Sequence, residues 1–255
     1  MERDHWRRVT DRLDPDTEFV EIYRILTAHE FPWDMNQALS FALFRTYAVP
    51  SIGSLLHRTG EFTERTQKRY DDTVHLLDAM LTDGLDGPRG RTALRRMNRM
   101  HAMHDISEDD LRYVLCTFVT VPERWLDDLG WRPMTRTERV AAARYYRHLG
   151  RHMGIRDIPE SPGEFATAMD DYERAHFGFD PGARAVADAT LDLMTTFPPN
   201  HRAPARLVRR ASYALMDGPL LDAFGYPHPT RVERAVVRSA LRARAAVVGR
   251  MPPRA

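Results

Sequence analysis

The sequence predicts an all-α fold of roughly ten helices joined by short loops. Two observations support this prediction. Apolar residues recur at spacings of three and four along most of the chain, and helix-capping residues stand before these segments. A third observation is negative, because no segment shows the sustained alternation of apolar and polar residues that is typical of a half-buried strand.

The first expected helix begins at Asp14-Pro15, because aspartate is a favoured N-cap and proline is favoured at the first helical position. Its apolar stripe is Phe19, Ile22, Tyr23 and Leu26. A later helix is expected over Arg91–His104, after the loop at residues 83–88.

The second half of the chain has clearer start signals. Ser107 precedes a helix that includes the β-branched stretch Val114–Val121, and Cys116 in this helix is expected to be buried and inert. Thr135 and Glu138 form a capping box, and the helix that follows is expected to end at Gly154. Further helices are expected after Ser161-Pro162 and Asp180-Pro181, and from Thr230 to about Val248.

The domain organisation follows from this pattern. Phe197-Pro-Pro-Asn200 is the best candidate for a boundary, but the chain beyond it is too short for an independent domain. We therefore expect one domain over residues 1–200, with residues 201–255 as its C-terminal helical extension. The tail at residues 251–255 is expected to be disordered.

Composition excludes several classes of protein. The chain has 255 residues, of which 43% are hydrophobic and 29% charged, as in ordinary globular proteins. A net charge of +1 gives no nucleic-acid signature, and one cysteine excludes a disulfide framework or a cysteine-rich zinc site. No apolar run approaches the ~20 residues of a membrane span, and the N-terminus lacks the apolar core of a secretory signal. A cytoplasmic location is therefore expected.

The C-terminus is basic. Its last 25 residues hold seven arginines (231, 234, 238, 242, 244, 250 and 254) and a single acidic residue, Glu233. The favoured interpretation is a solvated helix and tail, and the alternative is peripheral contact with an anionic membrane surface. The oligomeric state is left open.

Eleven histidines are the main chemical clue. The pairs His101/His104 and His148/His152 each place two imidazoles on one helix face, as a metal site requires. Neither pair has a carboxylate at a signature spacing, and the Glu-x-x-His at Glu173 stands alone. A surface or partly buried pair is favoured for His148/His152, and the roles of His104, His148 and His152 are left open.

His101 shares an apolar helix face with Leu94 and Met97. A neutral histidine there could bind haem iron, with nearby arginines pairing with the propionates, although spacing alone favours a core histidine. Without a Cys-x-x-Cys-His motif, covalent haem attachment is excluded. A second polar cluster consists of Arg69, Asp72, Thr73 and His75. Spacing alone does not show whether this cluster is a functional site or an ordinary solvated helix face.

Seven blocks of sequence, taken in order, resemble the MpaB-like oxygenase family, whose wider superfamily includes the bacterial rubber oxygenases. Each block alone is weak, but their order and spacing over about residues 30–180 are specific. The blocks are Phe31–Ser51, Lys68–Thr73, Arg95–Ala102, Ser107–Leu115, Val121–Trp125, Gly130–Thr135 and Met153–Pro159.

This resemblance implies haem b in a mostly helical, globin-like core, and the use of dioxygen to cleave carbon–carbon double bonds of isoprenoid chains. His101 matches the proximal histidine of the family, and Arg95 and Arg99 are the candidate cofactor-binding arginines beside it. The distal Arg-x-x-Lys-Thr motif matches Arg69, Asp72 and Thr73, so Asp72 replaces a lysine that can close the sixth iron position in rubber-cleaving members. The resting iron is therefore expected to be open or bound to water.

The resulting expectation is a haem-dependent oxygenase that acts on a small prenylated or terpenoid substrate, with O₂ as co-substrate and Arg69 and Thr73 orienting it. The aromatic stretches Phe41–Tyr47 and Phe118–Trp131 are expected to supply an apolar pocket. Two alternatives stay open. One is an all-helical lipophile-binding protein without catalysis. The other is a non-haem metal oxidase that uses Asp72, His75, His101 and His104.

Overall fold

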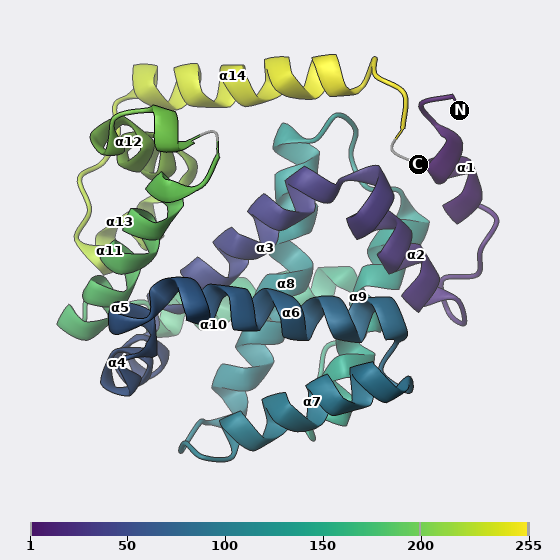
Figure 1. Ribbon diagram of the computed structural model, residues 1–255, viewed down its shortest axis with the longest axis horizontal. Coiled ribbons are helices and arrows are strands. Elements are labelled where there is room, and N and C mark those ends of the chain that lie inside the picture. The colour runs from purple at the N-terminus through teal and green to yellow at the C-terminus, as the bar shows by residue number, and fades with distance from the viewer. Residues whose placement is uncertain (1, 199, 254–255) are drawn as a thin grey trace. The chain divides into compact units, whose positions relative to one another are not determined.

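The structure is a computed structural model that describes residues 2–198 and 200–253. Over those residues it contains fourteen α-helices and two short turns of π- and 3₁₀-helix, with no β-strand (Figure 1). The prediction of an all-α fold is confirmed, with more helices than expected because several short ones escape sequence periodicity. The globin-like core stays a prediction.

The helices of the first half are α1 (His5–Thr10), α2 (Phe19–Ile25), the π-helical turn η1 (Leu26–Glu30), α3 (Pro32–Thr46), α4 (Pro50–Thr59), α5 (Glu61–Glu64), α6 (Thr66–Asp83) and α7 (Pro88–His101). Those of the second half are α8 (Glu108–Leu129), α9 (Arg136–His152), α10 (Pro162–His176), α11 (Pro181–Thr196), the 3₁₀ turn η2 (Asn200–Arg202), α12 (Ala205–Leu215), α13 (Gly218–Phe224) and α14 (Arg231–Val248).

The described residues form two compact units that are interleaved along the sequence. Unit 1 consists of residues 2–43, 73–171 and 245–253, and unit 2 consists of residues 44–72, 172–198 and 200–244. The expected division into residues 1–200 and 201–255 stays a prediction. Of the tail that was expected to be disordered, Arg254 and Ala255 lie outside the described residues.

Unit 1 is built around α9, which packs against α2 and α8. The hydroxyls of Tyr23 and Tyr146 share a buried hydrogen bond of 2.8 Å, and the Tyr23 ring stacks on Tyr145 with centroids 4.5 Å apart. Burial raises the pKa of all three tyrosines far above the ordinary value of a phenol. The hydroxyl groups therefore stay neutral, and the pair of Tyr23 and Tyr146 satisfies itself inside the apolar core.

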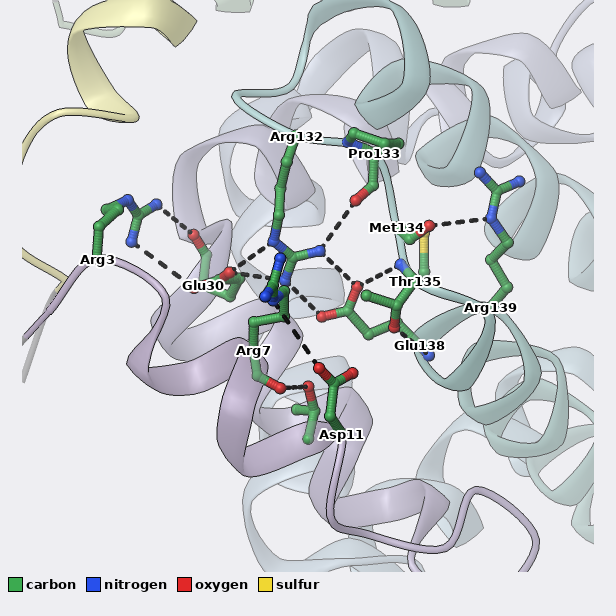
Figure 2. Close-up of polar contacts among 11 residues, drawn as sticks. Arg3, Arg7, Asp11, Glu30, Arg132, Pro133, Met134, Thr135, Glu138 and Arg139 are labelled. Carbon is green, nitrogen blue, oxygen red and sulfur yellow. Dashed lines mark hydrogen bonds and ion pairs between the residues drawn. The ribbon is translucent and has the colours of Figure 1, made fainter.

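Figure 2 shows a second feature of unit 1, in which the Arg132 guanidinium joins two buried carboxylates. Arg132 Nη2 lies 2.6 Å from Glu30 Oε1 and 2.6 Å from Glu138 Oε1, and both glutamate side chains are almost fully buried. Arg3 adds a longer ion pair to Glu30 at 3.7 Å and stacks over Trp131. Buried charges are tolerated only when they are paired, and here each buried carboxylate has a cationic partner. The network connects the end of η1 to the start of α9.

Unit 2 is centred on α11, which packs against α4, α5, α12 and α13. The close approach of α4 and α11 requires Gly53, because a Cβ at that position would lie 2.3 Å from Ala183 Cβ. Arg45 is held by Glu173 and by Asp217, whose Oδ2 lies 2.6 Å from its Nη1. These carboxylates raise the pKa of Arg45 against the opposing effect of burial.

Most of the expected helix starts are confirmed. Ser107 and Asp180 each accept a hydrogen bond from the backbone three residues later, at 3.0 Å and 2.7 Å. Both partners of the Thr135–Glu138 capping box are present, and Gly154 has a φ of +77° just beyond α9. Cys116 is buried, which raises the pKa of its thiol to about 12.

Two expected boundaries are wrong. The Asp14-Pro15 signal begins a turn, because the Asp14 carboxylate accepts hydrogen bonds from the Asp16 N–H and the Thr17 hydroxyl, both at 3.0 Å. Helix α2 therefore starts at Phe19. The helix expected over residues 91–104 is α7, which starts at Pro88 and ends at His101, so His104 lies outside it.

None of the described helices is by itself long and apolar enough to cross a membrane. Helices α3 and α4 satisfy the length and composition criteria only when taken together, and the chain bends sharply between them.

Candidate functional site

The two sequence clusters that the resemblance singled out lie on the consecutive helices α6 and α7. Figure 1 shows these helices running antiparallel, joined by a short loop. Gly90 at the start of α7 is required by this loop, because a Cβ there would lie 1.7 Å from the carbonyl oxygen of Gly84. The Asp83 carboxylate accepts hydrogen bonds from the backbone of Arg89 at 2.7 Å and Gly90 at 3.3 Å, and so caps α7.

His101 is the last residue of α7. Its side chain is partly buried, and its Nδ1 atom is excluded from solvent. His104, three residues further on, is exposed. Of the two candidate histidines, His101 is therefore the one in a partly desolvated position at a fixed helix end, which is what an axial ligand to a buried cofactor requires.

The last turn of α7 is anchored by Asn98. Its side-chain amide donates a hydrogen bond of 3.0 Å to the carbonyl oxygen of His152 at the end of α9. Asn98 and His101 are three residues apart and share a face of α7 with the buried Leu94. The hydrogen bond uses a helix-end carbonyl that lacks a partner inside its own helix.

The structure places Arg95 and Arg99 on exposed positions of α7. They lie about 120° and 160° around the helix from His101, given about 100° of rotation per residue. Arg95 Nη2 donates to the Thr92 hydroxyl at 3.2 Å. Their assignment as cofactor-binding residues stays a prediction, and it would require their long side chains to reach around the helix.

On α6, Arg69 and Thr73 are one turn apart on one face, as the spacing indicates, and both are partly buried. The Arg69 guanidinium lies 5.1 Å from the centre of the Phe62 ring. The charge of Arg69 also lowers the pKa of Tyr47, although burial has the larger effect and raises it overall. Phe62 and Tyr47 belong to unit 2 with Arg69. Tyr47 is part of the aromatic stretch Phe41–Tyr47 that was expected to line an apolar pocket, whereas no pattern in the sequence singled out Phe62.

Asp72 forms an ion pair with Lys68 one turn earlier, with Nζ and Oδ2 2.7 Å apart. This contact is the ordinary i, i+4 pair of a helix surface. Asp72 is thus engaged along its own helix, and the charge that it carries is balanced locally.

The set proposed for a non-haem metal is not gathered into one cluster. Among the described residues no group of three or more histidine, cysteine, aspartate or glutamate side chains is placed to hold a metal ion. His75 and His104 are exposed. The alternative that required Asp72, His75, His101 and His104 together therefore has no structural support.

The other histidine candidates are also explained by local packing. The rings of His148 and His152 are 4.6 Å apart and nearly perpendicular, and His148 also contacts Phe19. Partial burial lowers the pKa of His148, and the neighbouring His152 lowers it further. His148 is partly buried and His152 is exposed, which agrees with the expected surface or partly buried pair. In the Glu-x-x-His segment, Glu173 forms an ion pair with Arg45, and the His176 ring stacks on Tyr172.

The aromatic residues expected to line an apolar pocket pack largely against one another. In unit 1, Trp125 is buried, stacks on Phe41 at 5.6 Å and donates a hydrogen bond to Asp34. In unit 2, Phe44 contacts Phe224 at 5.2 Å. Their contribution to a substrate pocket stays a prediction.

Comparison with known proteins identifies the family. Residues 35–249, which include all of α6 and α7, match the family described as "ER-bound oxygenase mpaB/B'/Rubber oxygenase, catalytic domain". The chain belongs to this family. The resemblance seen in the sequence is thereby confirmed.

Three curated relatives belong to the MpaB group. The chain is 30% identical to "ER-bound oxygenase mpaB'" of Penicillium brevicompactum over 93% of its own length and 60% of the relative. It is 34% identical to "ER-bound oxygenase mpaB" of Penicillium roqueforti over 55% of the chain and 49% of the relative. For "ER-bound oxygenase mpaB" of Penicillium brevicompactum the identity is 30%, over 70% of the chain and 50% of the relative. The chain thus spans about half to 60% of the length of the MpaB relatives that it matches.

Proposed function

We propose that this chain is a haem b-dependent oxygenase that uses O₂ to oxidise or cleave an alkene in a small lipophilic substrate. The observation that carries the proposal is the placement of His101. It lies within the family match, in a partly buried position at the end of an anchored helix. The relatives are named oxygenases, which supports the reaction class.

The residues present fit haem better than a non-haem metal. Haem needs only one or two axial ligands from the protein, because the macrocycle supplies the other four. The described residues offer a suitably placed single histidine and no cluster of three ligands. When bound, haem would supply the dioxygen and one-electron chemistry that side chains lack.

His101 would supply the axial ligand, and Asn98 would fix the last turn of α7 that carries it. Arg69 and Thr73 would supply a cation and a hydroxyl donor from one face of α6, suited to an oxygen atom on which negative charge develops. Contact with the Phe62 ring, whose centre lies 5.1 Å from the Arg69 guanidinium, would help to hold this cation in place before the reaction begins. Such preorganisation is what makes an electrostatic donor effective.

The proposed substrate class follows from the family resemblance. Isoprenoid side chains of small molecules are the class that the family resemblance favours. The departure at Asp72, which pairs with Lys68, separates this chain from the rubber-cleaving pattern. A cytoplasmic location stays a prediction.

The test of the cofactor is spectroscopic. Purified protein, supplemented with haemin during expression, should show a Soret band and about one haem b per chain by the pyridine haemochrome assay. His101→Ala should lose the haem, whereas the matched control His104→Ala should retain it. Normal haem content in the His101 variant would mean that another residue is the ligand. A protein that binds no haem would favour the non-catalytic lipophile-binding alternative.

A further inference from the structure

Helix α14 has an uncharged face that nothing in the described structure covers. Eight uncharged residues of α14 are exposed and fall on one stripe, about 140° wide and about 24 Å long at 1.5 Å and 100° per residue. The side chains of Val232, Val236 and Val247 are 71%, 62% and 57% exposed. The eight residues are Val232, Ala235, Val236, Ser239, Ala240, Ala243, Ala246 and Val247.

The opposite side of α14 is fixed to the protein. Arg234 Nη1 donates a hydrogen bond of 2.7 Å to the carbonyl oxygen of Met216. Glu233 Oε2 lies 2.6 Å from Arg210 Nη2 on α12, and the same carboxylate accepts the backbone N–H of Thr230 at the start of the helix. The helix is therefore held with one side inward, which leaves the uncharged stripe facing outward.

The borders of the stripe are positively charged. Residues 231–250 contain six arginines and one acidic residue, Glu233, whose charge is already balanced by Arg210. Arg231 and Arg242 are exposed on one border of the stripe, and Arg244 lies on the other. An exposed apolar stripe with cationic borders is the pattern of a helix that lies in the plane of a membrane interface.

We propose that this face of α14 docks on the surface of an anionic phospholipid bilayer. Valine and alanine side chains insert only shallowly, so attraction between the arginines and the lipid headgroups must supply much of the affinity. The same charges argue against a second copy of the chain as the occupant, because a symmetric contact would bring the arginines of both copies together. This inference is independent of the proposed cofactor, although a membrane is also where a lipophilic substrate collects.

The test is co-sedimentation of the full chain with vesicles of phosphatidylcholine alone and of phosphatidylcholine with 30% phosphatidylserine. Binding should require phosphatidylserine and should fall at least tenfold between 50 and 300 mM salt. The double variant Val232→Asp/Val236→Asp should bind at least tenfold more weakly. Arg231→Gln/Arg242→Gln should also weaken binding, whereas Arg89→Gln/Arg136→Gln, which removes two exposed arginines elsewhere, should not.

Circular dichroism of each variant separates loss of binding from loss of folding. If the Val232→Asp/Val236→Asp variant unfolds α14, the Arg231→Gln/Arg242→Gln variant still tests the proposal. The proposal is overturned if the protein ignores phosphatidylserine vesicles at 50 mM salt, or if the valine and arginine variants bind as tightly as the wild type. It is also overturned if the valine substitutions abolish a dimer in analytical ultracentrifugation, because the stripe would then be covered by a second copy. Vesicle binding needs no haem, so its outcome is separate from that of the proposed activity.

Discussion

The side-chain amide of Asn98 donates a hydrogen bond of 3.0 Å to the carbonyl oxygen of His152, and thereby joins the last turn of α7 to the last turn of α9. The acceptor is a carbonyl at the end of a helix, where the backbone offers no partner of its own. His101 lies on the same face of α7 one turn further on. The turn of α7 that carries the candidate axial ligand is therefore joined to α9 by a contact between residues 54 positions apart.

Replacing Asn98 with alanine should remove this anchor. The loss of one hydrogen bond of this kind costs about 1 kcal/mol of folding free energy, or roughly 2–4 °C in Tm for a chain of this size. The rate of haem dissociation, measured as transfer of haem to apomyoglobin, should be higher in Asn98→Ala, because the turn that carries His101 gains conformational freedom. The exposed Asn36 provides a matched control as Asn36→Ala. An unchanged dissociation rate would show that the hydrogen bond does not position His101.

Removing Arg132 should destabilise unit 1 strongly. Arg132→Met leaves Glu30 and Glu138 buried beside each other without their shared cation, and breaking a buried pair in this manner costs about 3–5 kcal/mol. Chemical denaturation of the wild type and the variant measures the difference. Arg24→Met, which disrupts a surface pair with Glu21, should cost less than about 1 kcal/mol. A similar small loss for both variants would contradict a structural role for the network.

The attachment of α14 should depend on pH through Glu233. Its carboxylate accepts hydrogen bonds from Arg210 and from the start of the helix, which lower its pKa to about 2. Because the pKa is depressed in the folded state, the stabilising contribution is present above the ordinary glutamate value and is lost as the pH falls from about 4.5 towards 2. The stability difference between wild type and Glu233→Gln should therefore shrink over this interval. A difference that is constant from pH 6 to pH 2.5 would contradict the assignment.

Local chemistry explains which parts of the structure could be predicted from the sequence. Thr135 and Glu138 are three residues apart, and their capping box needs no information from the rest of the chain. Asp14-Pro15 was misleading because the same dipeptide suits both a helix start and a turn, and the hydrogen bonds of Asp14 to Asp16 and Thr17 select the turn.

Contacts that depend on tertiary packing are of a different kind. Arg132 binds Glu30, which is 102 positions away, and nothing near either residue in the sequence indicates that they pair. Phe62 and Arg69 are closer in sequence but lie on different helices, α5 and α6, so helical spacing does not connect them. The sequence motif predicts Arg69, Thr73 and His101 as site residues, and that assignment stays a prediction. Their contacts with Phe62 and through Asn98 depend on tertiary packing.

The last prediction concerns Arg69 and Thr73. If both groups stabilise charge that develops on an oxygen atom, Arg69→Ala and Thr73→Ala should retain haem but lose about 10²–10³-fold in turnover, the usual cost of one oriented donor. Lys68→Ala, which removes an exposed cation one residue away, should lose little. Turnover is measured as incorporation of ¹⁸O from ¹⁸O₂ into products of a panel of prenylated compounds. Normal turnover in the Arg69 variant would exclude it from the reaction, and products without label would exclude an oxygenase.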